Sequence, residues 1–253
     1  SYRLYRPANA PTPPAGLVVM LHGCQQNPED FAAGTRMNAI AEEHGLIVAY
    51  PGQTGASNAQ SCWNWFNPGD QGRDAGEPAI IAGLTRELML EFGLGREQVF
   101  IAGLSAGAAM AVVMGETYPE LYAAVGAHSG LPYRAANDVI SPSDAPPAVR
   151  TIVMHGSADR TVHPSNGHRI AASARPAGEQ EMVTQGSTGG RGWSMVRVPG
   201  PDGIAQLEFW TIEGAGHAWS GGSPEGSFTD QAGPDASREM VRFFLASGHA
   251  PAG

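Results

Sequence analysis

The stretch QVFIAGLSAGAAM, from Gln98 to Met110, decides the fold. It begins as an apolar run typical of a buried strand and ends as a run of small residues typical of a buried helix. Between them lies GLSAG, Gly103 to Gly107, which matches the G-x-S-x-G pattern. The pattern alone is weak, but a strand before it and a helix after it are the setting of a nucleophile elbow. We therefore predict that Ser105 is a nucleophile; the alternative is a serine that caps the helix after a tight turn.

The geometry of such a turn explains its residues. It holds the serine in a strained backbone conformation and places the hydroxyl above the sheet edge, at the N-terminus of a helix whose dipole favours an anion. A Cβ atom at Gly103 or Gly107 would collide with the strand or helix packed beside it. Both positions are therefore expected to require glycine.

Outward from this stretch, short apolar runs alternate with longer helical patterns. The apolar runs predict buried strands at Leu17–Leu21, Leu46–Pro51, Gln98–Gly103, Ala123–Ala127 and Thr151–Gly156, and a strand nearer the sheet edge at the more alternating run Ala205–Ile212. The helical patterns are Phe31–His44, Glu77–Phe92, Ser105–Thr117 and Ser237–Leu245. This alternation indicates an α/β fold with an open, mostly parallel central sheet flanked by helices. We expect the Gly-rich, polar segment Ala174–Gly203 to be a surface insertion with a short strand near WSMVRVP.

The composition limits the classes of partner. The chain has 253 residues, of which 42% are hydrophobic, and a formal net charge of −9. This length supports a sizeable core, and we expect residues 1–253 to form a single catalytic domain. An acidic chain without a basic stripe does not favour nucleic acid or anionic membranes, and no apolar run reaches the roughly 18 residues of a membrane span. We therefore expect no nucleic-acid or membrane partner, and the sequence leaves the oligomeric state open.

A serine nucleophile needs a base, and the chain order of this architecture, Ser, then Asp or Glu, then His, selects one histidine. His217 lies in GAGHAWSGG, a loop after the strand Ala205–Ile212 whose glycines let the backbone point the ring inward. The other histidines precede the serine or the acid candidates, lie too close to the best acid, or follow the last helix: His22, His44, His128, His155, His163, His168 and His249. We predict that His217 is the base; the alternative is a surface histidine in a loop.

The base in turn needs a carboxylate that orients it. Asp159 comes soon after the strand Thr151–Gly156, so it should stand at the carboxyl edge of the sheet, where open α/β folds place their sites. Asp138, Asp144 and Asp202 lie in polar stretches with no strand leading in. We predict that Asp159 is the acid; the alternative role, an Asx turn after a strand, is compatible with it.

An oxyanion hole needs two backbone N–H groups that point at the developing negative charge. One is expected from Ala106, directly after the nucleophile, and the other from the loop after an early strand. LHGCQQ is that loop, and we choose the N–H of Cys24 as the second donor. His22 is then interpreted as a structural residue of this loop.

At this point the motifs resemble a known family. VVMLHGCQQNPEDFAAGTRMNAIAEEHG, SCWNWF, GEP, VFIAGLSAGAAM, LYAAVGAHSG and GAGHAWSGG resemble the poly(3-hydroxybutyrate) depolymerase family of esterases, which is related to the feruloyl and acetylxylan esterases. The resemblance runs from about Tyr2 to Leu245. It implies an α/β-hydrolase fold, serine-esterase chemistry without metal or other cofactor, and a triad that maps onto Ser105, Asp159 and His217. The linker and separate polymer-binding domain that such depolymerases often carry are not visible in this chain.

In this fold the aromatic loop SCWNWF emerges at the same sheet edge as the elbow. Trp63 or Trp65 is then expected to wall the acyl or alcohol pocket, with Trp219 facing them, because aromatic walls suit an apolar polyester. The alternative is that these tryptophans seal a small core beneath a long loop. Cys62 has one possible partner, Cys24, so we predict a disulfide, with two buried thiols as the alternative. A disulfide would favour a secreted or periplasmic location. The sequence begins SYRLYRP, without Met or an apolar leader, so we expect that a signal or pro-segment has been removed or that the sequence is trimmed.

Together these features predict an esterase that hydrolyses poly(3-hydroxybutyrate), related hydroxyalkanoate polyesters or their oligomers through an acyl-enzyme. The main alternative is the same chemistry on feruloyl or acetyl esters of plant polysaccharide. A third hypothesis is a non-catalytic binding protein of this fold. Such proteins usually lose a member of the triad, and here all three positions are filled.

Overall fold

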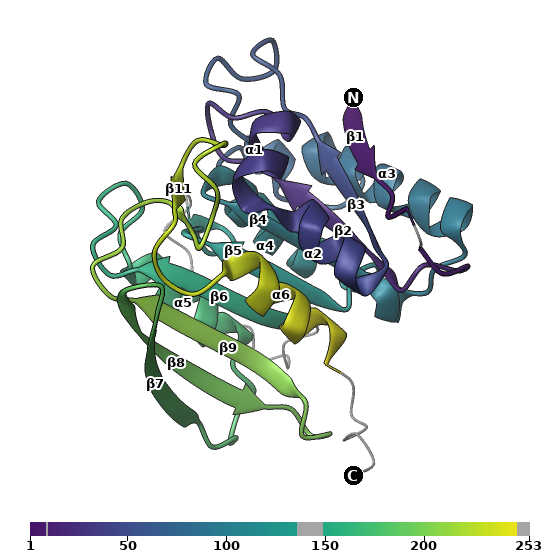
Figure 1. Ribbon diagram of the computed structural model, residues 1–253. Coiled ribbons are helices and arrows are strands. Elements are labelled where there is room, and N and C mark those ends of the chain that lie inside the picture. Colours follow the sequence, from purple (N-terminus) through teal and green to yellow (C-terminus); the bar gives the residue numbers. More distant parts are fainter. Residues whose placement is uncertain (9, 136–148, 247–253) are drawn as a thin grey trace.

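One sheet forms the centre of the molecule. The computed structural model describes residues 1–8, 10–135 and 149–246, and within them nine strands pair in the order β1-β3-β2-β4-β5-β6-β9-β8-β7 (Figure 1). Their bounds are Tyr2–Tyr5 (β1), Gly16–Leu21 (β2), Leu46–Pro51 (β3), Val99–Leu104 (β4), Ala124–His128 (β5), Arg150–Gly156 (β6), Met182–Thr188 (β7), Arg191–Pro199 (β8) and Ala205–Ile212 (β9). Two further short strands, Trp219–Ser220 (β10) and Thr229–Asp230 (β11), pair with each other.

The sheet is parallel in its middle and antiparallel at its edges. The strands from β3 through β2, β4, β5 and β6 to β9 are parallel, whereas β1, β7 and β8 are antiparallel to their neighbours. The inner strands β2 to β5 are buried along their whole length, because helices cover both faces, and this explains their uninterrupted apolar sequences. The predicted mostly parallel central sheet flanked by helices is confirmed.

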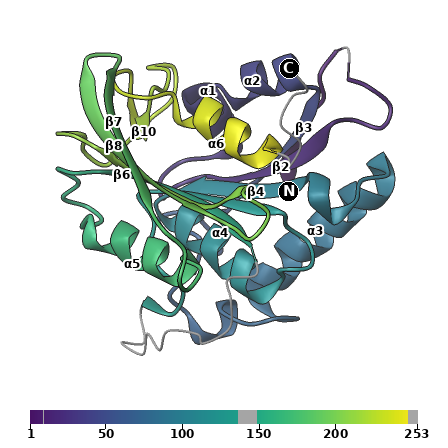
Figure 2. The ribbon, with the colours of Figure 1, turned by 90° about the horizontal axis from the view of Figure 1, so that it is seen from below.

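The helices form a layer on each face of the sheet. They are Pro28–Thr35 (α1), Met37–His44 (α2), Gly76–Phe92 (α3), Ala106–Thr117 (α4), Ser165–Ala174 (α5) and Ala236–Leu245 (α6), with short 3₁₀ helices at Pro68–Asp70 and Arg96–Gln98. Figure 2 shows α1, α2 and α6 on one face and α3, α4 and α5 on the other. Each layer has its own core, one containing Ile81 and Met110, the other Phe31 and Met240. No helix in the described part of the chain has the length and apolarity needed to cross a membrane.

The predicted helix Phe31–His44 is two helices. Arg36 separates α1 from α2 with a left-handed backbone, φ 54°. Its Nη2 donates to the carbonyl oxygen of Gly221 at 2.7 Å and to Oδ2 of Asp235 at 3.1 Å. These partners come from the distant end of the chain, so local periodicity gave no sign of the break.

The predicted surface insertion is a long hairpin that extends the sheet. β7 and β8 pair with each other, and β8 pairs with β9. The strand Ala205–Ile212 therefore lies inside the sheet, third from its edge, and the expectation that it lies nearer the edge is corrected. β7 is exposed along its whole length, so its sequence lacks the apolar alternation that would have revealed it.

The carboxyl ends of the inner strands meet at one edge of the sheet. The register pairs Leu21 of β2 with Gly103 of β4, and Leu104 of β4 with His128 of β5. Met154 of β6 follows in line with His128. The loops that leave β2, β4, β5 and β6 therefore start side by side, and they carry the predicted site residues.

Candidate active site

Ser105 occupies a sharp turn between β4 and α4. Its φ of 57° and ψ of −118° lie outside the regions that non-glycine residues normally adopt. A Cβ atom on Gly103 would lie 2.4 Å from the carbonyl carbon of Gly107, and one on Gly107 would lie 2.0 Å from the carbonyl oxygen of Leu21. The two glycines therefore let β2, β4 and α4 approach closely enough to form the turn. Strain of this kind is typical of functional positions.

Asp159 and His217 lie in direct contact. Nδ1 of His217 is 2.8 Å from Oδ2 of Asp159, while Oδ1 accepts the N–H groups of Thr161 and Val162 at 2.9 Å each. The carboxylate is 3% exposed. An ionised carboxylate only accepts, so Nδ1 of His217 carries the proton and Nε2 has the free lone pair.

The surroundings of Asp159 keep it ionised. Burial alone would raise its pKa, but the hydrogen bonds from His155, His217 and the Val162 N–H outweigh this effect and hold the pKa below the usual range of an aspartate. His155 was not predicted. Its Nε2 lies 2.9 Å from the carbonyl oxygen of Val162 and 3.5 Å from Oδ2 of Asp159. His155 is therefore a second histidine in contact with the carboxylate.

The predicted nucleophile and base are not hydrogen-bonded to each other. Among the described residues, the hydroxyl of Ser105 has no hydrogen bond to His217. Both residues nevertheless belong to segments that contact His128: the Ser105 N–H donates to the carbonyl oxygen of His128 at 3.0 Å, and Ser220, close after His217, donates to its ring at 3.1 Å. Nucleophile–base contacts are often long without substrate and tighten when it binds.

Two backbone N–H groups beside Ser105 have no acceptor in the described part of the chain: those of Cys24 and Ala106. The N–H groups on both sides of Cys24 are paired: that of Gly23 donates to Oε1 of Gln26 at 2.9 Å and that of Gln25 donates to the carbonyl oxygen of Gln60 at 2.7 Å. Ala106 begins a helix, where N–H groups have no partner within the helix. The sequence predicted these two N–H groups as the donors of an oxyanion hole, and that role stays a prediction.

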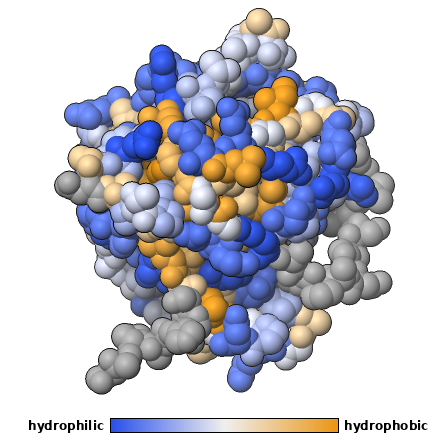
Figure 3. Space-filling view, turned by 90° about the vertical axis from the view of Figure 1, so that its right-hand side faces the viewer, coloured by the Kyte–Doolittle hydropathy of each residue, from blue (hydrophilic) through white to orange (hydrophobic). Residues whose placement is uncertain are grey.

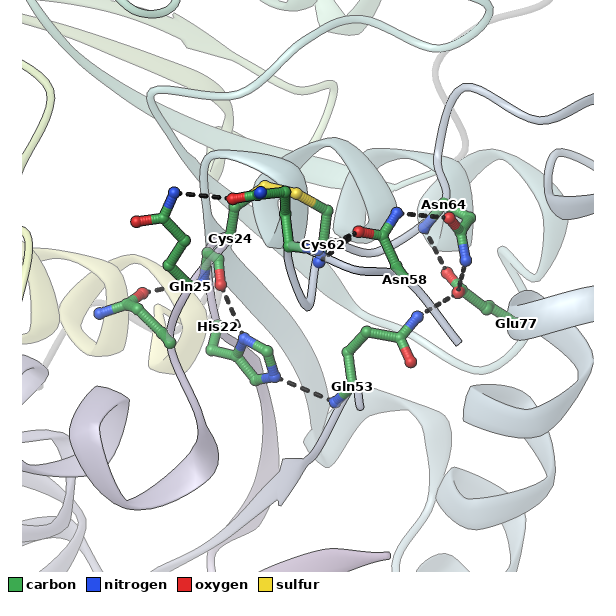
Figure 4. The surroundings of a disulfide bond; sticks show 11 residues. His22, Cys24, Gln25, Gln53, Asn58, Cys62, Asn64 and Glu77 are labelled. Carbon is green, nitrogen blue, oxygen red and sulfur yellow. Dashed lines mark hydrogen bonds between the residues drawn. A yellow bond between two sulfur atoms is a disulfide. The ribbon is translucent and has the colours of Figure 1, made fainter. Parts of the chain in front are cut away.

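A disulfide joins Cys24 to Cys62, with a Cα–Cα distance of 4.2 Å, and the predicted pairing is confirmed. Figure 4 shows that it ties the aromatic loop to the loop after β2. His22 lies beneath it, fully buried: Nδ1 donates to the carbonyl oxygen of Gly23 at 2.8 Å, and Nε2 accepts the Gln53 N–H at 3.0 Å. This agrees with the structural role expected for His22.

The three predicted substrate-binding tryptophans differ in their surroundings. Trp219 is fully buried, stacks on His128 at a ring distance of 5.2 Å and donates from Nε1 to Oγ of Ser237 at 3.2 Å. The expectation that Trp219 lines the substrate pocket is therefore wrong, because its ring is enclosed in the core between the sheet and α6. Trp63 is 4% exposed and packs against His22, as the alternative of a small core beneath the loop requires.

Trp65 differs from the other two because it is partly exposed. Its ring lies at 88° to that of Phe66, 5.6 Å away, and Phe66 is 40% exposed. Trp65 and Phe66 thus offer aromatic surface on the loop that the disulfide ties to Cys24. Of the predicted pocket walls, Trp65 remains a prediction.

A cavity of about 640 Å³ lies between α3 and the loop after β3, and its lining includes Tyr2, Gln53, Trp63 and Ile80. Figure 3 shows the side of the molecule that carries α3 and β1, with hydrophobic residues gathered among hydrophilic ones. Neither Ser105 nor any other predicted catalytic residue lines this cavity. It is therefore separate from the candidate reaction centre.

The remaining candidates of the sequence analysis do not join the site. Asp202 is exposed and accepts the N–H of Ile204 at 3.0 Å in a turn before β9. Asp138, Asp144 and His249 lie outside the described residues. Within residues 1–8, 10–135 and 149–246, no three His, Cys, Asp or Glu side chains gather as metal ligands.

Known esterases are similar to this chain over much of its length. Poly(3-hydroxyalkanoate) depolymerase C of Paucimonas lemoignei is 31% identical over 235 residues, covering 83% of this chain and 55% of that protein. The probable acetylxylan esterase A of Aspergillus fumigatus is 30% identical over 193 residues, covering 64% of this chain and 51% of that protein. The chain thus spans about half the length of these relatives.

Solved structures show the same fold. The acetyl xylan esterase from Aspergillus awamori superposes with a TM-score of 0.74 at 21% identity, over 97% of this chain and 94% of that one. The architecture is that of the α/β-hydrolase esterases. Residues 1–163 match the family described as "Esterase PHB depolymerase", and the chain belongs to that family.

Proposed function

We propose that this chain is a serine esterase that hydrolyses ester bonds of poly(3-hydroxybutyrate) or related hydroxyalkanoate polyesters and their oligomers. The single observation that carries the proposal is the 2.8 Å contact between Asp159 and His217, at the same sheet edge as a strained serine turn. We propose Ser105, His217 and Asp159 as nucleophile, base and orienting acid. Family membership and the relative from Paucimonas lemoignei support the choice of substrate.

The first half of the reaction forms an acyl-enzyme. Oγ of Ser105 attacks the ester carbonyl while Nε2 of His217 takes its proton, and Asp159 stabilises the resulting imidazolium. The N–H groups of Cys24 and Ala106 hold the oxyanion, which accounts for two donors that have no other acceptor among the described residues. His217 then gives its proton to the leaving alcohol.

The second half releases the acid. Water attacks the ester of Ser105, His217 again accepts a proton, and the same two N–H groups hold the second oxyanion. The serine is then regenerated, and the product is a hydroxy acid or a shorter oligomer. We propose that Trp65 contacts the apolar part of the substrate, that residues 1–253 act as one catalytic domain, and that the protein works outside the cytoplasm, as its disulfide favours.

The second candidate function is deacylation of plant polysaccharide. The relative from Aspergillus fumigatus and the structural neighbour from Aspergillus awamori favour it, and both are named as acetylxylan esterases. The chemistry at Ser105 would be unchanged. Polyester hydrolysis and polysaccharide deacylation differ in the protein surface that binds the part of the substrate outside the reacting ester.

The test compares three substrates with the wild-type protein and Ser105→Ala. Clearing of a poly(3-hydroxybutyrate) suspension, release of acetate from acetylated xylan and hydrolysis of ethyl ferulate are measured in parallel. We expect clearing that disappears in Ser105→Ala. Acetate or ferulate release without clearing would replace the polyester with the polysaccharide substrate, and activity that persists in Ser105→Ala would reject the mechanism.

A further inference from the structure

His128, the last residue of β5, contacts both halves of the candidate catalytic apparatus. Its carbonyl oxygen accepts the Ser105 N–H at 3.0 Å, and its ring Nε2 accepts the Ser220 N–H at 3.1 Å. Ser220 ends the loop that carries His217. One residue therefore holds the backbone of the nucleophile on one side and the loop of the base on the other.

The surroundings of the ring fix its tautomer. A backbone N–H can only donate, so Nε2 of His128 must present its lone pair to Ser220, and the proton must lie on Nδ1. Nδ1 lies 3.3 Å from Oγ of Ser129, which can accept it. Trp219 stacks on the ring at an angle of 28°, so the imidazole is held from its face as well as its edges.

The ring also stays neutral. His128 is 1% exposed, and burial lowers its pKa to about 3. Burial is the largest cause of this shift; the charged forms of His155 and His217 contribute to the same lowering of the pKa, and Asp159 opposes it. Nε2 therefore remains an acceptor throughout the neutral pH range, including when His217 becomes protonated during a reaction.

The loop that carries His217 needs such an anchor. It runs from β9 to β10 and contains Gly214 and Gly216, and glycine gives a chain more conformational freedom than any other residue. Asp159 holds the ring of His217, the Ala158 N–H holds the near end of the loop through the carbonyl oxygen of Ala215 at 3.0 Å, and His128 holds the far end. That end is tied to β5, next to the strand that delivers Ser105.

We propose that His128 is a positioning residue that sets the placement of His217 relative to Ser105 through its bond to the Ser220 N–H. The inference rests on the proposed serine-esterase function, because it assigns His128 no contact with substrate. A shift of about 1 Å in the relative placement of reacting groups can cost about 100-fold in rate. The expected signature is therefore a loss of kcat with little change in KM.

The test compares His128→Leu, which removes the acceptor, with His128→Gln, whose amide oxygen can reach the same N–H. Hydrolysis of p-nitrophenyl acetate and the rate of Ser105 labelling by a fluorophosphonate are measured. We expect His128→Leu to lower kcat and the labelling rate about 10- to 100-fold with KM within about 3-fold, and His128→Gln to recover most of the loss.

Tyr122→Phe is the matched control for lost stability. It removes another fully buried hydrogen bond, 2.9 Å between the Tyr122 hydroxyl and Oγ1 of Thr85, and Tyr122 lies just before β5, at the other end of that strand from His128. We expect it to lower the melting temperature and leave kcat within about 2-fold. Equal kcat in His128→Leu and wild type, or a loss in His128→Gln as large as in His128→Leu, would overturn the inference.

A measurement on the wild-type protein covers the case in which His128→Leu does not fold. The ¹⁵N chemical shifts of the His128 ring should show a proton on Nδ1 and none on Nε2 from pH 5 to 8. A proton on Nε2, or titration in this range, would overturn the inference while leaving the esterase proposal intact. A wild-type protein that neither hydrolyses the ester nor reacts with the fluorophosphonate would instead reject the proposed function.

Discussion

Oδ2 of Asp159 lies 2.8 Å from Nδ1 of His217, and the other carboxylate oxygen is occupied by two backbone N–H groups. Oδ2 is thus the oxygen left for side chains, and it faces Nδ1 of His217 and, at 3.5 Å, Nε2 of His155. The backbone N–H groups of the turn after β6 hold the carboxylate in place. The imidazole that it orients is therefore presented with its Nε2 lone pair available.

Asp159→Asn should lower kcat about 10⁴-fold, because an amide nitrogen facing Nδ1 would favour the tautomer with the proton on Nε2. The measurement is steady-state hydrolysis of p-nitrophenyl acetate, with circular dichroism to confirm folding. Asp202→Asn is the matched control, since Asp202 is exposed and lies in a turn before β9. An Asp159→Asn variant that keeps a tenth of the wild-type rate would remove Asp159 from the mechanism.

The disulfide should contribute about 3–4 kcal/mol to the free energy of unfolding, because Cys24 and Cys62 close a loop of 38 residues in the unfolded chain. Guanidinium unfolding of wild type and of the double variant Cys24→Ser, Cys62→Ser measures the difference. Thiol titration of the unfolded, unreduced protein should find none. Equal stability of the two proteins would show that the contacts between Gln25 and Gln60 suffice to hold the loops together.

Trp219, which is buried, and Trp65, which is partly exposed, should respond differently to truncation. Trp219→Ala should lower the free energy of unfolding by about 3–5 kcal/mol, because it leaves a cavity between His128 and Phe31. Trp65→Ala should change stability far less and should weaken activity on polyester more than on p-nitrophenyl acetate. If Trp65→Ala lowers activity on polyester and on p-nitrophenyl acetate equally, the ring packs in the core beneath the loop and does not contact the polyester.

Much of this fold was predictable because its central strands are buried on both faces. Such strands have uninterrupted apolar sequences, and the run at Leu46–Pro51 coincides with β3. The more alternating run at Ala205–Ile212 coincides with β9. The break at Arg36 was not predictable from local periodicity, since the partners of its side chain, Gly221 and Asp235, lie far along the chain. The exposed strand β7 has no apolar periodicity in its sequence, because it is held by hydrogen bonds to β8 and not by burial of its own side chains.

Some features of the candidate site were predictable from the sequence and others were not. Chain order and strand ends were enough to select Asp159 and His217, and the structure brings them into contact. The burial of Trp219 depends on His128 and Ser237, which local sequence does not connect to it. His128 itself was excluded as a base by chain order, and nothing in the sequence indicated its bonds to Ser105 and Ser220.

The acid sensitivity of stability should depend on His128. Its pKa is about 3 in the folded protein and roughly 6.5 in the unfolded chain, so the unfolded state binds the extra proton between these values. The contribution of neutral His128 to stability is therefore fully present above about pH 6.5 and is lost progressively as the pH falls towards 3.

The size of this effect can be measured against His128→Gln, which has no titrating group at the same place. The wild-type free energy of unfolding should fall relative to that of the variant by up to about 1.4 kcal/mol per pH unit below pH 6. Urea unfolding at several values from pH 7 to 4.5 gives the two curves. His155, His217 and Asp159 face the ring in both proteins, so their effects on stability largely cancel in the difference. Parallel curves would mean that the folded protein accepts a proton on His128 as readily as the unfolded chain does, and the bond from Ser220 could then not fix the ring as an acceptor.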